Sequence, residues 1–156
     1  MARAFVGIGS NLGDRGSALE QAVDAIGALP ATTVTRVSSI RETDAVGLVD
    51  QPRFLNGAVE LETGLAPEAL LAALLAAEQA LGRDRAGVPK GGPRTIDLDL
   101  LLYDDRRIDR SELEIPHPRL HERRFVLEPL AELDPDLEVP GKGAVQTLLA
   151  RLDSGS

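Results

Sequence analysis

Residues 54–63 read FLNGAVELET, and this stretch decides the fold because it alternates between the two faces of a strand. Leu55, Val59 and Leu61 share one face, while the opposite face is mixed and includes Asn56. Strict alternation over ten residues is typical of a strand with one face on the core and does not fit a helix. We therefore predict a strand over 54–63.

Working outward from this strand, the other elements follow from the helical spacing of apolar residues, from β-branched runs and from glycine and proline stops. The expected order is strand, helix, strand, strand, helix, strand, which is a split βαβ unit. It predicts a ferredoxin-like α+β fold: an antiparallel sheet with helices on one face, followed by C-terminal additions. The expected strands are 4–8, 32–42 and 95–103, the helices are 16–29 and 67–82, and the additions begin at Asp104 and contain helices at 124–133 and 144–152.

The composition fits one domain over residues 1–156. Of 156 residues, 43% are hydrophobic and 27% are charged, so the chain can bury a core without cross-links. Cysteine is absent, which excludes disulfides, thiolate metal sites and cysteine nucleophiles. No apolar run approaches the roughly 20 residues that a membrane-spanning helix needs. We expect a soluble, cytoplasmic protein that works as a monomer and has no membrane partner.

Charge is unevenly placed along the chain. The net charge of −8 argues against a protein that binds the nucleic-acid backbone. Ten of the 17 basic residues nevertheless fall between Arg83 and Arg124, together with nine acidic ones. This gathering of cations indicates either a small anionic ligand or a solvated arginine-rich face.

The paired carboxylates of Asp97 and Asp99 carry the most chemistry. On a strand both would point to the face opposite Ile96, Leu98 and Leu100, with Leu102 on the same side as these three. Two carboxylates so close repel each other unless a cation lies between them. Aspartate is also disfavoured inside strands, so a merely wet, acidic edge is the weaker interpretation. We predict a Mg²⁺ site that combines both carboxylates with substrate phosphates.

The segment just before the aspartates is rich in glycine and proline and carries Arg83, Arg85, Lys90 and Arg94. Arginine binds phosphate oxygens through two parallel hydrogen bonds, and a loop of this kind can close over a reacting group. The alternative is a surface loop with solvated charges. The position of this segment next to Asp97 and Asp99 favours the phosphate-binding interpretation.

Two glycine-rich segments lack the spacing that phosphate-binding motifs require. Residues 7–13 (GIGSNLG) do not match a dinucleotide fingerprint, and residues 141–143 (GKG) do not match a P-loop. Neither a Rossmann fold nor a P-loop is therefore supported. We predict that residues 9–14 form a turn.

The remaining candidates are two histidines and two aromatic residues. His117 lies between two prolines and is a candidate phosphate contact; with His121 four residues later it could begin a zinc site, but a suitable third ligand is not nearby. Phe54 is placed beside Asn56, whose amide both donates and accepts hydrogen bonds, a pairing that suits a flat heterocycle. Phe125 is either a core residue or a second aromatic wall.

Four ordered motifs resemble the 6-hydroxymethyl-7,8-dihydropterin pyrophosphokinase family. They are residues 7–14 (GIGSNLGD), 50–58 (DQPRFLNGA), 92–101 (GPRTIDLDLL) and 116–127 (PHPRLHERRFVL). The resemblance implies transfer of the pyrophosphoryl group of ATP to the hydroxymethyl oxygen of the pterin, giving AMP and the pterin diphosphate of folate biosynthesis. It also implies two Mg²⁺ ions bound with ATP.

The same resemblance implies roles for individual residues. Catalysis would involve Arg83, Arg94, Asp97 and Asp99, and the two aspartates would hold the metal. ATP would contact Glu78, Arg85, Arg94, Leu100, His117 and Arg123. The pterin would contact Thr43, Ala45, Val46, Phe54, Asn56, Asp97 and Phe125. Where relatives often carry a tryptophan before the Gly-Pro-Arg, this chain has Gly91.

Two other classes of function use a similar fold. A nucleotidyltransferase or cyclase-like domain also suits paired aspartates and two-metal chemistry, but it would release pyrophosphate rather than AMP. A small-molecule regulatory module would bind its ligand without turnover and has no need for the Asp97 and Asp99 pair. An RNA-binding sheet fits poorly, because aromatic platforms are scarce.

Overall fold

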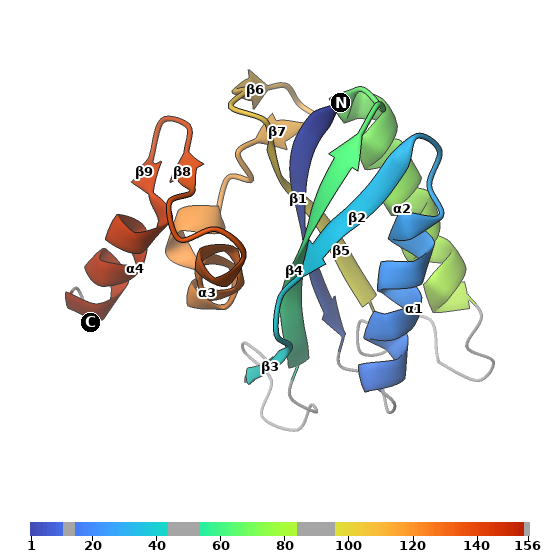
Figure 1. Cartoon of the computed structure of the whole chain (residues 1–156), viewed down its shortest axis with the longest axis horizontal. Coiled ribbons are helices and arrows are strands. Elements are labelled where there is room, and N and C mark those ends of the chain that lie inside the picture. The colour runs from blue at the N-terminus through green and yellow to red at the C-terminus, as the bar shows by residue number, and fades with distance from the viewer. Residues whose placement is uncertain (11–14, 44–53, 84–95, 155–156) are drawn as a thin grey trace.

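The computed structural model describes residues 1–10, 15–43, 54–83 and 96–154. Its main sheet is built from β1 (Ala2–Ser10), β2 (Thr32–Val37), β3 (Arg41–Thr43), β4 (Phe54–Thr63) and β5 (Ile96–Tyr103). All strand pairs are antiparallel, in the order β2-β4-β1-β5, and β3 pairs with β4 as well. The structure is therefore a mixed α+β fold with an antiparallel sheet, as predicted (Figure 1).

Helices α1 (Arg15–Gly27) and α2 (Pro67–Arg83) cover one face of this sheet. Their apolar stripes, which include Leu19, Ile26, Leu70 and Leu74, are buried against inward-facing residues of β1, β4 and β5. Burial of these stripes is what makes the helices stable, because most helical stability in proteins comes from packing rather than from propensity. Pro67 occupies the first helical position of α2, where its missing N–H costs nothing.

The C-terminal additions contain two short hairpins and two helices. The hairpins pair β6 (Ile108–Asp109) with β7 (Glu114–Ile115), and β8 (Glu138–Val139) with β9 (Gly143–Ala144). A 3₁₀ turn, η1 (Leu120–Glu122), precedes α3 (Arg124–Leu133), and α4 (Val145–Ser154) ends the described chain. The strand predicted at 54–63 and the helix predicted at 124–133 have these bounds in the structure.

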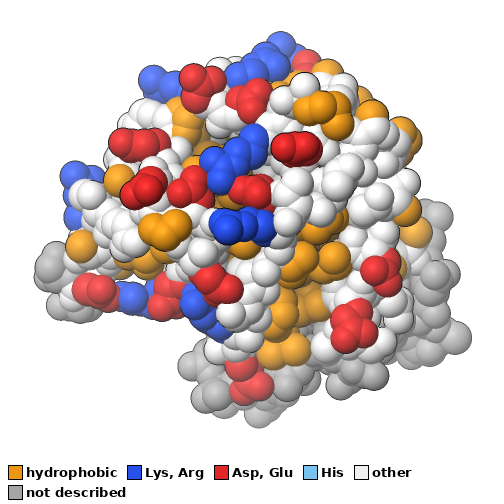
Figure 2. All heavy atoms as spheres, in the orientation of Figure 1, with side chains coloured by type: hydrophobic (Ala, Val, Ile, Leu, Met, Phe, Trp, Pro, Cys, Tyr) orange, Lys and Arg blue, Asp and Glu red, His pale blue; other side chains and the backbone are white. Residues whose placement is uncertain are grey.

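Helix α3 packs on the sheet face opposite α1 and α2, so the expectation of helices on one face holds only for the first two. The reason is a second apolar cluster: Phe5, Ala58 and Leu101 on the sheet meet Leu127 and Leu130 of α3. Charged pairs close the same junction. The Arg3 guanidinium lies 2.6 Å from the Glu60 carboxylate and 3.0 Å from that of Asp134. Figure 2 shows acidic and basic side chains interspersed over the left and centre of this side of the molecule.

Three local predictions were wrong. Gly9 lies in β1 rather than in a turn, because it pairs with residues of both neighbouring strands. The second strand does not run unbroken to residue 42: it ends at Val37, and β3 begins at Arg41. Leu102 lies on the α3 side, because the β1–β5 register shifts between Phe5 and Val6 and the extra residue in β5 reverses its alternation.

Candidate active site

A row of residues crosses three strands on the sheet face that carries α3. Gly9 of β1 pairs with Asn56 of β4 on one side and with Asp97 of β5 on the other. Residues that pair directly across an antiparallel ladder project to the same face, so Asn56 and Asp97 flank a position without a side chain. A Cβ at Gly9 would come within 2.7 Å of the Asn56 Oδ1 atom, so the glycine is needed for Asn56 to lie where it does.

The next row along the strands has the same character. Gly7 pairs with Ala58 on β4 and with Asp99 on β5. Asp97 and Asp99 therefore lie on one face, about 7 Å apart along the strand, and both are half-buried. Ile96, Leu98 and Leu100 are buried on the other face, so the predicted orientation of both aspartates is confirmed.

These two carboxylates are a suitable donor set for Mg²⁺. Within the ranges that the structure describes, no group of three or more His, Cys, Asp or Glu side chains forms a cage that could hold a metal by itself. Magnesium does not need such a cage, because it binds through one or two carboxylates and completes its shell with water and phosphate oxygens. The oxygen ligands fit a hard cation carried in with a phosphate-bearing substrate.

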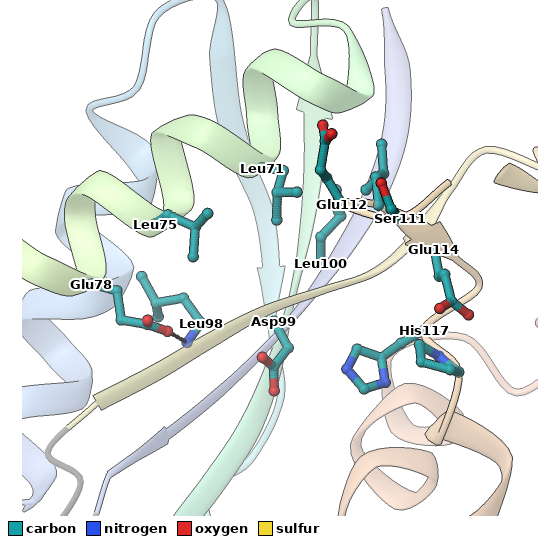
Figure 3. A pocket seen from close by; sticks show the side chains of 12 residues that line it. Leu71, Leu75, Glu78, Leu98, Asp99, Leu100, Ser111, Glu112, Glu114 and His117 are labelled. Carbon is teal, nitrogen blue, oxygen red and sulfur yellow. Dashed lines mark hydrogen bonds between the residues drawn. The ribbon is translucent and has the colours of Figure 1, made fainter. Parts of the chain in front are cut away.

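A pocket of about 350 Å³ lies along the outer edge of β5 (Figure 3). It lies between α2 and the segment that contains β7, and Asp99 forms part of its wall. Its volume falls within the range of small-molecule sites. The pocket is lined by Leu71, Leu75, Glu78, Leu98, Asp99, Leu100, Ser111, Glu112, Leu113, Glu114, His117 and Pro118.

Backbone groups of β5 face this pocket because β5 is an edge strand. The Leu98 N–H points away from β1 and donates to the Glu78 Oε2 atom at 2.9 Å. Successive residues of a strand direct their backbone groups to opposite sides, so the N–H and C=O of Leu100 point the same way as those of Leu98. Glu78 thus holds α2 against the strand edge, and Leu100 presents one donor and one acceptor to the pocket.

His117 lies across the pocket from α2, and Figure 3 shows it beside Asp99. Its backbone N–H donates to the Leu101 carbonyl at 3.0 Å, and its ring Nδ1 accepts from the Arg119 N–H at 3.3 Å. Burial lowers the pKa of the imidazole, and the nearby positive charge of Arg123 lowers it further. The ring is therefore neutral at pH 7 with its proton on Nε2, which is available to donate a hydrogen bond.

Arg123 and Phe125 stand at the start of α3. Arg123 is the residue that precedes the first helical turn, and its guanidinium carbon lies 5.6 Å from the centre of the Phe125 ring. That distance is within the range of a cation–π contact. Phe125 is only half-buried, so it is not a core residue as its type alone would suggest.

Several predicted site residues fall outside the described residues: Ala45, Val46, Arg85 and Arg94. Thr43 ends β3 and is paired with Phe54, the first residue of β4, and Arg83 is the last residue of α2. The structure brings six of the other candidates together in two groups: Asn56, Asp97 and Asp99 on the sheet face, and Glu78, Asp99, Leu100 and His117 around the pocket. Asp99 belongs to both groups.

Sequence reasoning missed Gly9 and Gly7 as parts of the site, as well as Glu112 and Glu114 in the pocket wall. The signal for the glycines was present: they alternate with the buried residues Val6 and Ile8, which identifies a strand face without side chains. No comparable signal marked the two glutamates, because only the tertiary fold brings residues 112–114 against α2.

An antiparallel α+β fold with paired carboxylates beside a ligand-sized pocket is typical of enzymes that transfer phosphate-containing groups. Residues 5–135 match the model of one family of this class, 7,8-dihydro-6-hydroxymethylpterin-pyrophosphokinase (HPPK). The chain belongs to this family.

Curated relatives agree with the family match. The chain is 50% identical over 135 residues to the 2-amino-4-hydroxy-6-hydroxymethyldihydropteridine pyrophosphokinase of Bacillus subtilis. The aligned residues make up 86% of this chain and 80% of the relative. It is 44% identical over 148 residues to the enzyme of the same name from Pseudomonas aeruginosa, with 95% and 90% covered. The predicted activity is confirmed: the chain is a pyrophosphokinase of folate biosynthesis.

Solved structures support the fold. The chain superimposes on a crystal structure of an HPPK-DHPS chain in complex with substrates with a TM-score of 0.77 and 13% identity, over 99% of this chain and 44% of that one. Plasmodium falciparum HPPK-DHPS with pterin and p-hydroxybenzoate gives a TM-score of 0.74, over 99% and 43%. The chain thus spans less than half the length of these solved chains. Within the described ranges, no helix is both long and apolar enough to cross a bilayer.

Proposed function

We propose that the pyrophosphoryl transfer takes place at the Asp97 and Asp99 pair, with the pterin held on the sheet face and ATP held in the pocket at the edge of β5. One observation carries this proposal: Asp99 belongs both to the face that carries Asn56 and to the wall of the pocket. The acceptor hydroxyl of one substrate and the phosphates of the other can therefore meet at the carboxylates.

The pterin would lie against the row formed by Asn56, Gly9 and Asp97. These three Cα positions span two strand spacings, about 10 Å, and the central glycine leaves room for a flat ring. Asn56 would hydrogen-bond the ring edge, since its amide can both donate and accept. Phe125 at the start of α3 and Phe54 at the start of β4 would supply the aromatic walls, with Thr43, Ala45 and Val46 near the ring edge.

The nucleotide would occupy the pocket between α2 and His117. The Leu100 backbone offers the base one donor and one acceptor, and the leucines of α2 provide an apolar wall. The neutral His117 would donate its Nε2–H to a phosphate oxygen. Arg123 lies near His117, and Arg83, Arg85 and Arg94 are assigned to the phosphates from the family resemblance.

Asp97 and Asp99 would hold two Mg²⁺ ions that arrive with ATP. The chemistry that the ions would supply there is neutralisation of the charge on the triphosphate. The chain's own contribution is to fix both carboxylates on a rigid strand, where they need no reorganisation during the reaction. All these residues come from one chain, so the proposal requires only a monomer.

The fold itself supports a finer classification as ferredoxin-like. The element order β1-α1-β2-β4-α2-β5 and the sheet order β2-β4-β1-β5 place β4 between the two strands that α1 connects, as a split βαβ unit requires.

The test compares Asp97→Asn and Asp99→Asn with Asp105→Asn, an exposed aspartate just beyond the other end of β5. AMP release from ATP and 6-hydroxymethyl-7,8-dihydropterin is followed at saturating Mg²⁺. We expect kcat to fall on the order of 100-fold or more in the first two variants, because each loses one preorganised charge. The Asp105 variant should retain its rate. Normal turnover in a folded Asp99→Asn protein would rule out the proposed metal site.

A further inference from the structure

Glu132 near the end of α3 binds the short connection between β2 and β3. Its Oε2 atom accepts from the Ser39 backbone N–H at 2.7 Å and from the Ser39 hydroxyl at 2.8 Å. Its Oε1 atom accepts from the Arg41 Nη2 atom at 3.3 Å. The hydrogen bond from the Ser39 backbone lowers the pKa of Glu132, so the carboxylate stays charged at pH 7.

The strand that this connection leads into is short and lies at the edge of the sheet. β3 has three residues, Arg41–Thr43, and among the described residues it pairs with the start of β4 alone. A pair of so few residues has few ladder hydrogen bonds, and isolated short pairings are marginally stable in water. The three hydrogen bonds to Glu132 are an additional anchor for this connection. They come from the face of the sheet, where α3 packs, and not from the neighbouring strand.

Arg41 is the link between this anchor and the candidate site. It pairs directly with Asn56 across the β3–β4 ladder, and directly paired residues project to the same face. The row described above therefore continues outward from Asn56 to Arg41. The Arg41 Nη1 atom is buried and has no hydrogen-bond partner within the described part of the chain, whereas its Nη2 atom pairs with Glu132, and the side chain as a whole is 40% exposed.

We propose that Glu132 is a positioning residue for the pterin subsite, acting through Ser39 and Arg41 on the outer side of Asn56. The inference rests on the proposed placement of the pterin against Asn56. Without the carboxylate, the Ser39 N–H loses its acceptor and the Arg41 guanidinium loses its counter-charge. Both changes loosen β3 beside Asn56, whereas the pocket at the edge of β5 lies on the other side of β1 and is not touched.

The experiment titrates 6-hydroxymethylpterin into the protein by calorimetry, with Mg²⁺ and α,β-methylene-ATP present, and titrates the nucleotide analogue separately. Glu132→Ala should weaken pterin binding about tenfold or more, as expected for losing charge-assisted hydrogen bonds. Glu132→Gln keeps an acceptor for the Ser39 N–H and should recover part of the loss. Ser39→Ala removes only the hydroxyl donor and should have the smallest effect. Nucleotide binding should stay within about twofold in all three.

Glu128→Gln is the matched control, because it removes the same charge one turn earlier on the same helix, and it should leave pterin binding unchanged. Asn56→Ala in the same titration separates this inference from the proposed function. If Asn56→Ala weakens pterin binding while Glu132→Ala does not, the positioning role fails and the pterin site stands. If neither variant weakens it, both fail. Equal weakening of pterin and nucleotide by Glu132→Ala would indicate general destabilisation and would also overturn the positioning role.

Discussion

Replacing Gly9 with alanine should weaken pterin binding by displacing Asn56, not by blocking the site directly. A Cβ at this position would lie 2.7 Å from the Asn56 Oδ1 atom, whereas ordinary van der Waals contact begins at 3.4 Å. The amide must therefore move by about 0.7 Å. Asn56 is buried, so its amide has little room to move.

The expected cost has two parts. Overpacking a tight position costs about 1–3 kcal/mol of folding free energy, and loss of unfolded-chain freedom on replacing glycine returns about 0.4–1 kcal/mol. We expect a net loss of stability between about 0 and about 2.6 kcal/mol in urea unfolding. A displaced hydrogen-bonding amide should in addition raise the pterin dissociation constant by about tenfold, which corresponds to about 1.4 kcal/mol.

The comparison variant is Gly7→Ala, two residues away on the same strand face. There the atom nearest to a Cβ would be in the Leu101 side chain at 3.4 Å, an ordinary contact, so stability and pterin affinity should change little. A double-mutant cycle completes the test. In an Asn56→Ala background the Gly9→Ala substitution should lose its effect on affinity, because the group it displaces is gone. Undiminished pterin affinity in Gly9→Ala itself, measured by calorimetry, would refute the reasoning.

Two further predictions concern stability. Because the pKa of His117 is lowered in the folded state, the unfolded chain binds this proton more readily, and stability should fall as pH drops below about 6.5. Urea unfolding at pH 7.5 and 5.5 should show a smaller difference in stability for His117→Asn than for the unchanged protein. An equal difference in both proteins would contradict a lowered pKa of His117. Leu130→Ala should cost about 2–5 kcal/mol, since this side chain is fully buried between α3 and the sheet. The same substitution at Leu75, which is 47% exposed, should cost far less in the same unfolding assay.

Much of the fold could be predicted because its signals are local. The alternation of residues 54–63 gave β4 with its bounds, and the 3.6-residue spacing from Arg124 gave α3 even though Pro129 lies inside that helix. The facing of Asp97 and Asp99 followed from alternation alone, because β5 is regular up to Leu100. Each of these features depends on neighbours a few residues apart.

The features that were mispredicted depend on partners far along the chain. Leu102 changes face because of a register shift opposite Phe5 and Val6, about a hundred residues earlier, and nothing in residues 96–103 marks it. The connection between β2 and β3 hydrogen-bonds through Ser39 to Glu132, some ninety residues later. Gly9 reads as turn chemistry unless the strands on both sides of it are known.

The amino-acid sequence by itself determined the order of strands and helices, the pairing of two aspartates on one strand face, and membership of a pyrophosphokinase family, because periodicity and short motifs are properties of neighbouring residues. Only the tertiary structure decided that Asn56, Gly9 and Asp97 form one row, that Asp99 also lines the pocket, and that α3 packs on the same face of the sheet. Those relations arise when antiparallel register and the burial of a second apolar cluster bring distant segments together, and no short stretch of the chain encodes them.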